Sequence, residues 1–177
     1  MIILELISEI DARNRLTSRK GFSIFKFKKN NINITRLELI HLPFYAFDLQ
    51  VENEGTKQNV NLAVDGLLGH AVFFVNEDLS FTDEKNVNKC NFELPPAEAE
   101  EIILKEYKGL LLETGLRTRK LSKAAEVTGY KQIFYPFWVG YFKKRGAYDF
   151  QALDAVSGSV QGIKMRKLFL KAFRVLK

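Results

Sequence analysis

The chain has 177 residues, of which 46% are hydrophobic and 27% charged, and its formal net charge is +6. This composition excludes a disordered chain, and no run approaches the roughly 18 uninterrupted apolar residues that a membrane span requires. Because Glu5 and Glu9 interrupt the apolar N-terminus, we expect no signal peptide and a cytoplasmic location.

Thiol and imidazole groups are scarce in the sequence. Cys90 is the single cysteine, which excludes an intramolecular disulfide and argues against a cysteine-based metal cluster. His41 and His70 are the two histidines, so there is little material for a metal site or a catalytic triad. We therefore predict no metal, no cofactor and no catalytic residue, and we interpret Cys90 as structural.

The first third of the chain predicts a helix followed by strands. Apolar residues recur at helical spacing over residues 2–16, from Ile3 to Ile10, which predicts an amphipathic helix. Apolar and polar residues alternate in FSIFKFKK (22–29) and NITRLELIHL (33–42), as in half-buried strands.

An aromatic block that contains a proline follows, IHLPFYAFDL (40–49). Since proline cannot donate a ladder hydrogen bond, we expect Pro43 at a strand start, an edge or a bulge. We interpret His41 as a strand residue. The next segment, NLAVDGLLGHAVFF (61–74), has an aspartate ahead of glycine between apolar runs, so Asp65 is expected to cap a turn and Gly69 to supply positive φ.

The second half repeats this order. PPAEAEEIILKEYKGLLLETG (95–115) combines prolines and acids at its start with a glycine at its end, which predicts a helix. The weaker segment 116–135 leads to a second aromatic block, IFYPFWVGYF (133–142), and then to FQALDAVSGSVQGI (150–163). Pro136 follows Pro43 after 93 positions and Asp154 follows Asp65 after 89, so we interpret the two halves as a drifted duplication.

The charge is concentrated at the C-terminus. Met165, Leu168, Phe169, Ala172, Phe173 and Leu176 form an apolar helical stripe. The last fifteen residues hold six cations and no acid, which leaves 21 cations against 21 acids elsewhere. A basic face that extends over a whole domain, as in nucleic-acid binders, is therefore not expected.

The order of helix, meander and D-x-x-x-G turn resembles the PepSY and cystatin-like superfamily, and YDFQALDAVSGSVQG (148–162) is similar to the end of a PepSY unit. The resemblance implies a curved antiparallel sheet around one helix, and a non-catalytic module that binds proteins or small ligands. It implies no particular binding residue.

Together these features predict an α+β fold of two repeated units, each with one helix packed on an antiparallel β-meander, and a C-terminal amphipathic helix. The expected boundaries are 1–92, 93–162 and 163–177, in one compact body.

The leading functional hypothesis is a non-catalytic binding or adaptor module with a protein partner, and a homodimer is an option. Tyr45, Phe137 and Trp138 are either core residues or a ligand or partner surface. One alternative is association with an anionic membrane or nucleic acid through the cations Lys164, Lys167, Lys171 and Arg174. A second is an enzyme with a site near His70 and Asp65.

Overall fold

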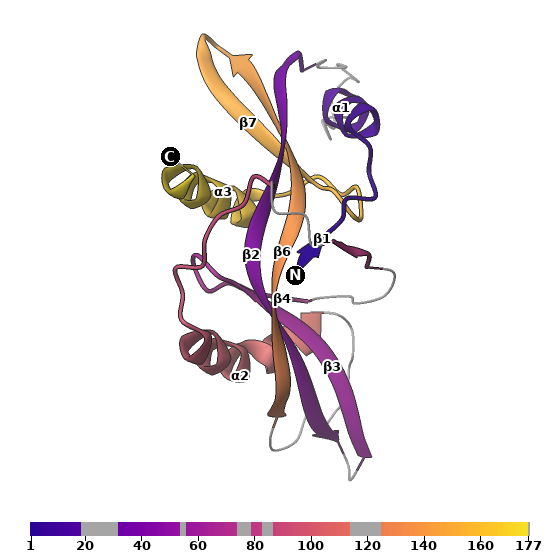
Figure 1. Ribbon diagram of the computed structural model, residues 1–177, viewed down its shortest axis with the longest axis vertical. Helices are drawn as coiled ribbons and strands as arrows, with labels where there is room; N and C mark the ends of the chain where they lie inside the picture. The colour runs from indigo at the N-terminus through magenta and orange to yellow at the C-terminus, as the bar shows by residue number, and fades with distance from the viewer. Residues whose placement is uncertain (19–31, 54–55, 74–78, 83–86, 114–124, 177) are drawn as a thin grey trace. The chain divides into compact units, whose positions relative to one another are not determined.

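The computed structural model describes residues 1–18, 32–53, 56–73, 79–82, 87–113 and 125–176 (Figure 1). Its helices are α1 (Glu9–Thr17), α2 (Pro96–Glu113) and α3 (Ile163–Val175). Its strands are β1 (Ile2–Ile3), β2 (Ile34–Asn53), β3 (Thr56–Asp65), β4 (Ala71–Phe73), β5 (Phe81–Thr82), β6 (Ala125–Lys144) and β7 (Ala147–Asp154). The predicted α+β class is confirmed.

The strands form one mixed sheet with the order β4-β3-β2-β6-β1-β5, and β7 pairs with β6. Two long antiparallel hairpins dominate it, β2–β3 and β6–β7. The expected meander is not purely antiparallel, because β1 runs parallel to β6 at Ile2 and Phe134. No helix within the described ranges combines the length and the hydrophobicity that crossing a bilayer requires.

The chain packs into two compact units that do not follow sequence order. Unit 1 consists of Met1–Ile3, Leu42–Asp83 and Cys90–Tyr135, and unit 2 of Leu4–His41, Glu84–Lys89 and Pro136–Lys177. The strands β2 and β6 are each 20 residues long, and each contributes its two halves to different units. The structure shows no clear succession of two tandem units, and the predicted boundaries at 92 and 162 stay a prediction.

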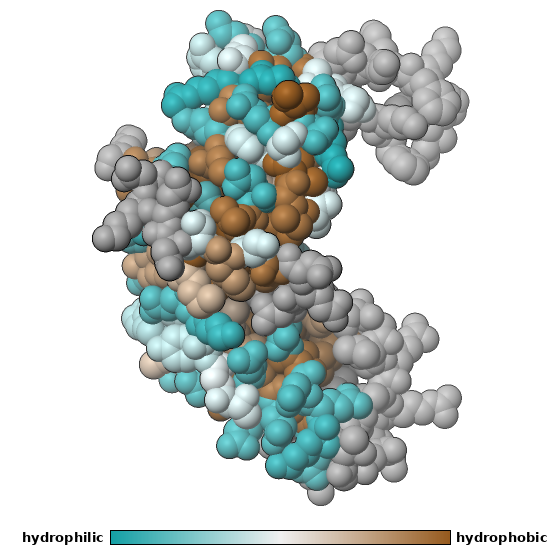
Figure 2. Space-filling model, turned by 45° about the vertical axis from the view of Figure 1, so that its right-hand side comes forward, coloured by the Kyte–Doolittle hydropathy of each residue, from teal (hydrophilic) through white to brown (hydrophobic). Residues whose placement is uncertain are grey.

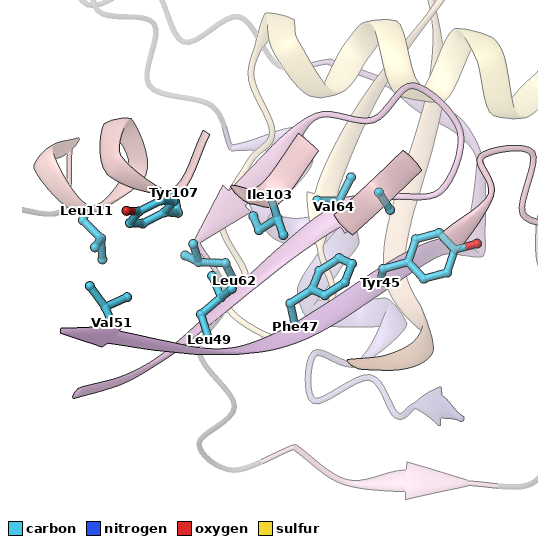
Figure 3. Close-up of a cluster of buried hydrophobic side chains, with 10 residues drawn as sticks. Tyr45, Phe47, Leu49, Val51, Leu62, Val64, Ile103, Tyr107 and Leu111 are labelled. Carbon is cyan, nitrogen blue, oxygen red and sulfur yellow. The ribbon is translucent and has the colours of Figure 1, made fainter. Parts of the chain in front are cut away.

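The core of unit 1 lies between the β2–β3 hairpin and α2. Figure 3 shows side chains of β2 and β3, among them Phe47 and Leu62, pointing toward Ile103 and Tyr107 of α2. The α2 residues that face this cluster are spaced by three or four positions, as one buried helical face requires. The sheet face is contributed by the first half of the sequence and the helix by the second.

The core of unit 2 uses the opposite combination. Ala12 and Leu16 of α1 pack with Trp138 and Phe142 of β6 and with Leu153 of β7. The first half therefore supplies the helix and the second half the hairpin. This differs from the expectation that each helix covers the strands that follow it, because the segment before each helix is hydrogen-bonded to the hairpin of the other half.

The first helix is shorter than predicted. Residues 2–8 are not helical, because Ile2 and Ile3 pair with β5 and the Ser8 side chain accepts a hydrogen bond from the Asp11 N–H to start α1. Ile10 is 73% exposed, so the stripe that predicted the helix is not its buried face. The predicted helices of 95–115 and 163–177 are confirmed as α2 and α3.

Both prolines lie inside long strands and not at a strand start, which was one of the three positions expected, beside an edge and a bulge. The Pro43 carbonyl accepts from Gly66 N–H at 2.8 Å, and the Pro136 carbonyl accepts from Ala155 N–H at 3.1 Å. The β2–β3 and β6–β7 ladders begin one residue later, at Phe44 and Phe137. Each proline therefore stands where its ladder ends and needs no N–H donor there.

Two predicted segments lie outside the described residues. The strand expected at 22–29 is one, and positions 116–124 of the weaker segment are the other. The rest of that segment belongs to β6, which begins at Ala125.

We predict that the folded structure persists after the chain is cleaved between its two halves. If a site for a specific protease is inserted between residues 84 and 85, the cleaved fragments should co-elute in size-exclusion chromatography and separate only in denaturant. The reason is that each hydrophobic cluster contains residues of both fragments. If the fragments separate under native conditions, the proposal that each unit is built from both halves of the chain is wrong. The uncleaved protein is the control.

Candidate functional site

The Asp65 carboxylate is a structural acceptor in the turn after β3. It is 1% exposed and accepts hydrogen bonds from the N–H groups of Leu67, Leu68 and His70, at 3.0, 2.6 and 2.7 Å. Gly69 has φ of 74°, a conformation that glycine adopts without strain. The predicted turn chemistry is confirmed here, and the carboxylate has few lone pairs left for catalysis.

Asp154 holds the turn after β7 in the same way. Its carboxylate accepts from the N–H groups of Val156 and Ser157 at 2.8 and 2.9 Å, and Gly158 has φ of 72°. Its own N–H donates to Ser159 O at 2.9 Å, as the Asp65 N–H donates to His70 O at 3.1 Å. The two turns therefore share one hydrogen-bond pattern.

His70 lies beside the first turn. Its Nδ1 is 3.2 Å from Asp65 Oδ2, but its side chain is 52% exposed. The residue at the matching place in the second turn is Ser159. The second histidine, His41, is a buried residue of β2, as predicted. The pair of His70 and Asp65 is thus an imidazole at the edge of a turn whose carboxylate is already engaged.

Tyr45 is a buried anchor for the segment that leads into α2. It is 1% exposed, its hydroxyl donates to Leu94 O at 2.7 Å, and its ring lies 4.7 Å from that of Phe92. Burial, with a smaller contribution from Tyr130, raises its pKa. The turn helps to hold the same segment, because Gly66 O accepts from the N–H groups of Glu93 and Leu94.

Trp138 has the corresponding role in unit 2. It is 8% exposed, and its indole N–H donates to Ile7 O at 2.7 Å, in the segment that leads into α1. Ala155 O accepts from the N–H groups of Leu6 and Ile7 at 2.9 and 2.8 Å. Tyr45 and Trp138 are therefore each enclosed in the core of one unit, and neither lies on an exposed surface.

Phe137, the third aromatic candidate, is buried beneath α3. Its ring lies 5.3 Å from that of Phe169, and Tyr141 and Phe150 contact Phe173 at 6.0 and 5.0 Å. Leu168, Phe169 and Ala172 are buried, so the predicted apolar stripe faces the sheet. The helix docks on the face of the β6–β7 hairpin that carries these three aromatic residues.

The hairpin of unit 1 differs at these docking positions. The residues that correspond to Phe137, Tyr141 and Phe150 at the two sequence offsets are Phe44, Asp48 and Asn61. Asp48 and Asn61 are polar and partly exposed. A polar pair in place of two aromatic rings gives this face no apolar surface of the kind that α3 covers in unit 2.

Docking of α3 directs its cations to solvent. Lys164, Lys167 and Arg174 are exposed and Lys171 is partly exposed, on the side opposite the buried stripe. These four residues lie off the apolar stripe of the helix, and their role as an anionic-partner surface stays a prediction. Ile163 and Leu170 are the exposed apolar residues between them, at 81% and 46%.

Arg166, also on α3, ties the helix to the edge of β7. It donates to the Asp149 carboxylate at 2.7 Å and to Phe150 O at 3.0 Å, and its guanidinium lies 4.3 Å from the Phe150 ring. Burial alone would raise the pKa of Asp149, but hydrogen bonds from Arg166 and the Phe150 N–H, with the charge of Lys144, lower it below its ordinary value.

Lys143 and Tyr148 extend this surface, and no pattern in the sequence predicted them. They are directly paired across β6 and β7, and Lys143 Nζ lies 5.2 Å from the Tyr148 ring centre. Two positions along the hairpin lies the pair of Tyr141 and Phe150, which contacts α3. Residues two apart on a strand share a face, so Lys143 and Tyr148 lie on the side that carries α3. Tyr148 is 75% exposed.

Metal-ligating residues do not gather in the part of the chain that the structure describes: no three of His, Cys, Asp and Glu lie together there. Cys90 is buried, and burial, with the nearby Glu93 charge, raises its thiol pKa to about 11. A thiol with this pKa is protonated at neutral pH and unreactive.

No protein-family model, curated protein or solved structure matches the chain. The resemblance to the PepSY and cystatin-like superfamily stays a prediction.

We predict that Asp65→Ala lowers the free energy of unfolding by about 3 kcal/mol, because three backbone donors lose a charged acceptor. Asp154→Ala should cost about 1 to 2 kcal/mol, since two donors are affected and Ser157 is exposed. His70→Ala should cost less than about 1 kcal/mol, as a pair open to solvent does. Urea unfolding measures all three, and a loss in His70→Ala equal to that in Asp65→Ala would contradict the turn role.

We predict that the ion pair of Arg166 and Asp149 stabilises the fold by about 1 kcal/mol at pH 7, after allowance for its partial exposure. Its stabilisation is complete above the ordinary carboxyl pKa of about 4 and disappears as pH falls through the lowered pKa of folded Asp149. The difference in unfolding free energy between wild type and Arg166→Met should therefore shrink in acid.

The control for this prediction is Lys164→Met, which removes an exposed cation from the same helix and should have little effect on unfolding at either pH. If the difference in unfolding free energy between wild type and Arg166→Met does not change with pH, then packing of the guanidinium on Phe150 stabilises the fold and the ion pair does not.

Proposed function

We propose that the protein is a non-catalytic binding module that recognises a polyanionic partner through unit 2. The surface in question is the basic face, defined as Lys143, Lys164, Lys167, Lys171 and Arg174. The observation that carries this proposal is the division of charge between the units together with the outward direction of the α3 cations.

The described residues of unit 2 contain twelve Lys and Arg against six Asp and Glu. The described residues of unit 1 contain four against ten. The cations of unit 2 are Arg13, Arg15, Arg36, Lys89, Lys143, Lys144, Arg145, Lys164, Arg166, Lys167, Lys171 and Arg174. A single-sign surface of this kind raises the local concentration of oppositely charged partners and their association rate.

Few acids offset the basic face. Residues 136–176 contain two, Asp149 and Asp154. Asp149 is paired with Arg166, and Asp154 accepts from the backbone of its turn. The other functional candidates are explained by folding: Tyr45, Phe137 and Trp138 lie in cores, and Asp65 holds a turn. This supports a binding role in preference to a site at His70.

A partner protein, a homodimer and a cytoplasmic location stay predictions.

For a membrane partner, insertion of the α3 stripe would require the helix to leave Phe137, Tyr141 and Phe150, because the stripe is buried on them. Figure 2 shows a face of the molecule on which brown hydrophobic side chains lie between teal hydrophilic ones.

We also infer that the two hairpins derive from one duplicated segment. Three matched features support this: the proline carbonyl that accepts from the turn, the aspartate that caps the turn, and the aromatic residue two positions after the proline, which donates to the segment before a helix.

The test is elution from a heparin column, since heparin is a polyanion. The variant Lys167→Glu, Lys171→Glu, Arg174→Glu should elute at much lower salt than wild type, because log affinity falls with log salt in proportion to the number of ionic contacts. The matched control is Lys57→Glu, Lys105→Glu, Lys108→Glu, which changes the net charge equally but at exposed positions of unit 1. Equal losses in both variants would show that net charge alone determines retention and would contradict the proposed surface.

A further inference from the structure

An exposed aromatic side chain stands at the end of the basic face. Tyr148 is 75% exposed, more than any other exposed aromatic residue in the described ranges. A lone exposed tyrosine needs no explanation by itself. Its position does, because it lies on the α3 side of the hairpin and directly opposite Lys143.

The helix and this pair form one continuous surface. Phe173, near the end of α3, contacts both Tyr141 and Phe150, which form the next pair on the same face of the hairpin as Lys143 and Tyr148. Two residues along a strand cover about 7 Å, so Tyr148 lies roughly that far along β7 from Phe150, which Phe173 contacts. The four α3 cations span ten residues, or roughly 15 Å of helix.

The turn of the hairpin holds Tyr148 in a fixed place. Lys144 pairs with Ala147 around a two-residue loop of Arg145 and Gly146, and both loop residues have positive φ, at 51° and 83°. Loops of this kind match the twist of the strands they join. The ring of Tyr148 is therefore presented on a paired strand and not on a free loop, with Lys143 beside it and Arg145 in the adjoining loop.

We propose that this surface binds single-stranded nucleic acid, with the basic face on phosphates and Tyr148 stacked on one base. The inference rests on the proposed polyanion binding and adds the class of ligand to it. Single-strand binding proteins combine a track of cations with aromatic rings on which bases stack, and their shortest sites hold about four nucleotides. Duplex DNA fits less well, since its bases are already stacked and a ring at the edge of a sheet has no free base to meet.

Other anionic partners use the surface less completely. A membrane would use the charge of the headgroups, but the apolar stripe that would enter it is buried on unit 2. An acidic protein segment would meet the cations and would leave the aromatic ring without a specific role. Both classes are distinguished from nucleic acid by the dependence of binding on a base.

The experiment measures the fluorescence anisotropy of a labelled single-stranded oligothymidine of eight nucleotides and of an abasic strand of the same length. Wild type should bind the oligothymidine more tightly than the abasic strand. Tyr148→Ala should weaken binding of the oligothymidine about tenfold, within the range of one stacked base, and leave the abasic strand unaffected. Tyr148→Phe should retain the wild-type affinity, because its ring stacks equally well.

The charge variant Lys167→Glu, Lys171→Glu, Arg174→Glu should weaken binding of both strands, with a lower dependence on salt. Thermal unfolding of each variant verifies the fold, and Tyr148 is exposed enough that its replacement should not alter it. Pelleting with phosphatidylserine vesicles, without binding of either strand, would overturn the inference in favour of a membrane.

Two further outcomes separate this inference from the proposed function. If wild type and Tyr148→Ala bind the two strands equally, while heparin is retained through α3, then the base-stacking site is wrong and polyanion binding stands. If neither heparin nor either strand is bound, both proposals fail.

Discussion

The fold depends on how the segment before each helix is fastened to a distant hairpin. In unit 1, Tyr45 and the Gly66 carbonyl hold the residues that precede α2. In unit 2, Trp138 and the Ala155 carbonyl hold those that precede α1. These bonds place each helix over strands from the other half of the chain.

The position of each helix matters because it determines which apolar side chains are buried. Burial of a large side chain such as Ile103 of α2 contributes about 1.5 to 3 kcal/mol, a sizeable part of a typical stability of 5 to 15 kcal/mol.

The two hairpins share the same turn structure but present different sheet faces. Both turns have an aspartate acceptor, a glycine with positive φ and a proline carbonyl partner. What differs is the sheet face opposite the covering helix. Aromatic residues at 141 and 150 give unit 2 an apolar face on which α3 docks, whereas Asp48 and Asn61 leave the matching face of unit 1 polar. Two side chains thus decide whether a second helix can be bound there.

Charge follows the division into units and not the order of the sequence. Counted along the chain, cations and acids balance until the last fifteen residues. In the fold, the acidic α2 belongs to unit 1, whereas the cations of the β6–β7 hairpin join those of α3 in unit 2. The basic surface is therefore wider than the C-terminal helix alone, and an exposed tyrosine lies at its end.

Local signals in the sequence were sufficient for α2, α3, the two aspartate turns and the outward cations, because each depends on residues within a few positions of one another. They failed for the start of α1 and for the exchange of helices between hairpins. Ile2 and Ile3 fall within the helical spacing of the N-terminal segment, and they form a strand because they pair with residues near Phe81 and Phe134, far along the chain. The prolines fit inside strands because each ladder begins one residue later. Tyr148 and Lys143 became a candidate site only through cross-strand pairing. The sequence by itself determined α2, α3 and the two aspartate turns, and the tertiary structure decided where α1 begins and which distant strands each helix covers, since those outcomes depend on contacts between segments that lie far apart in the sequence.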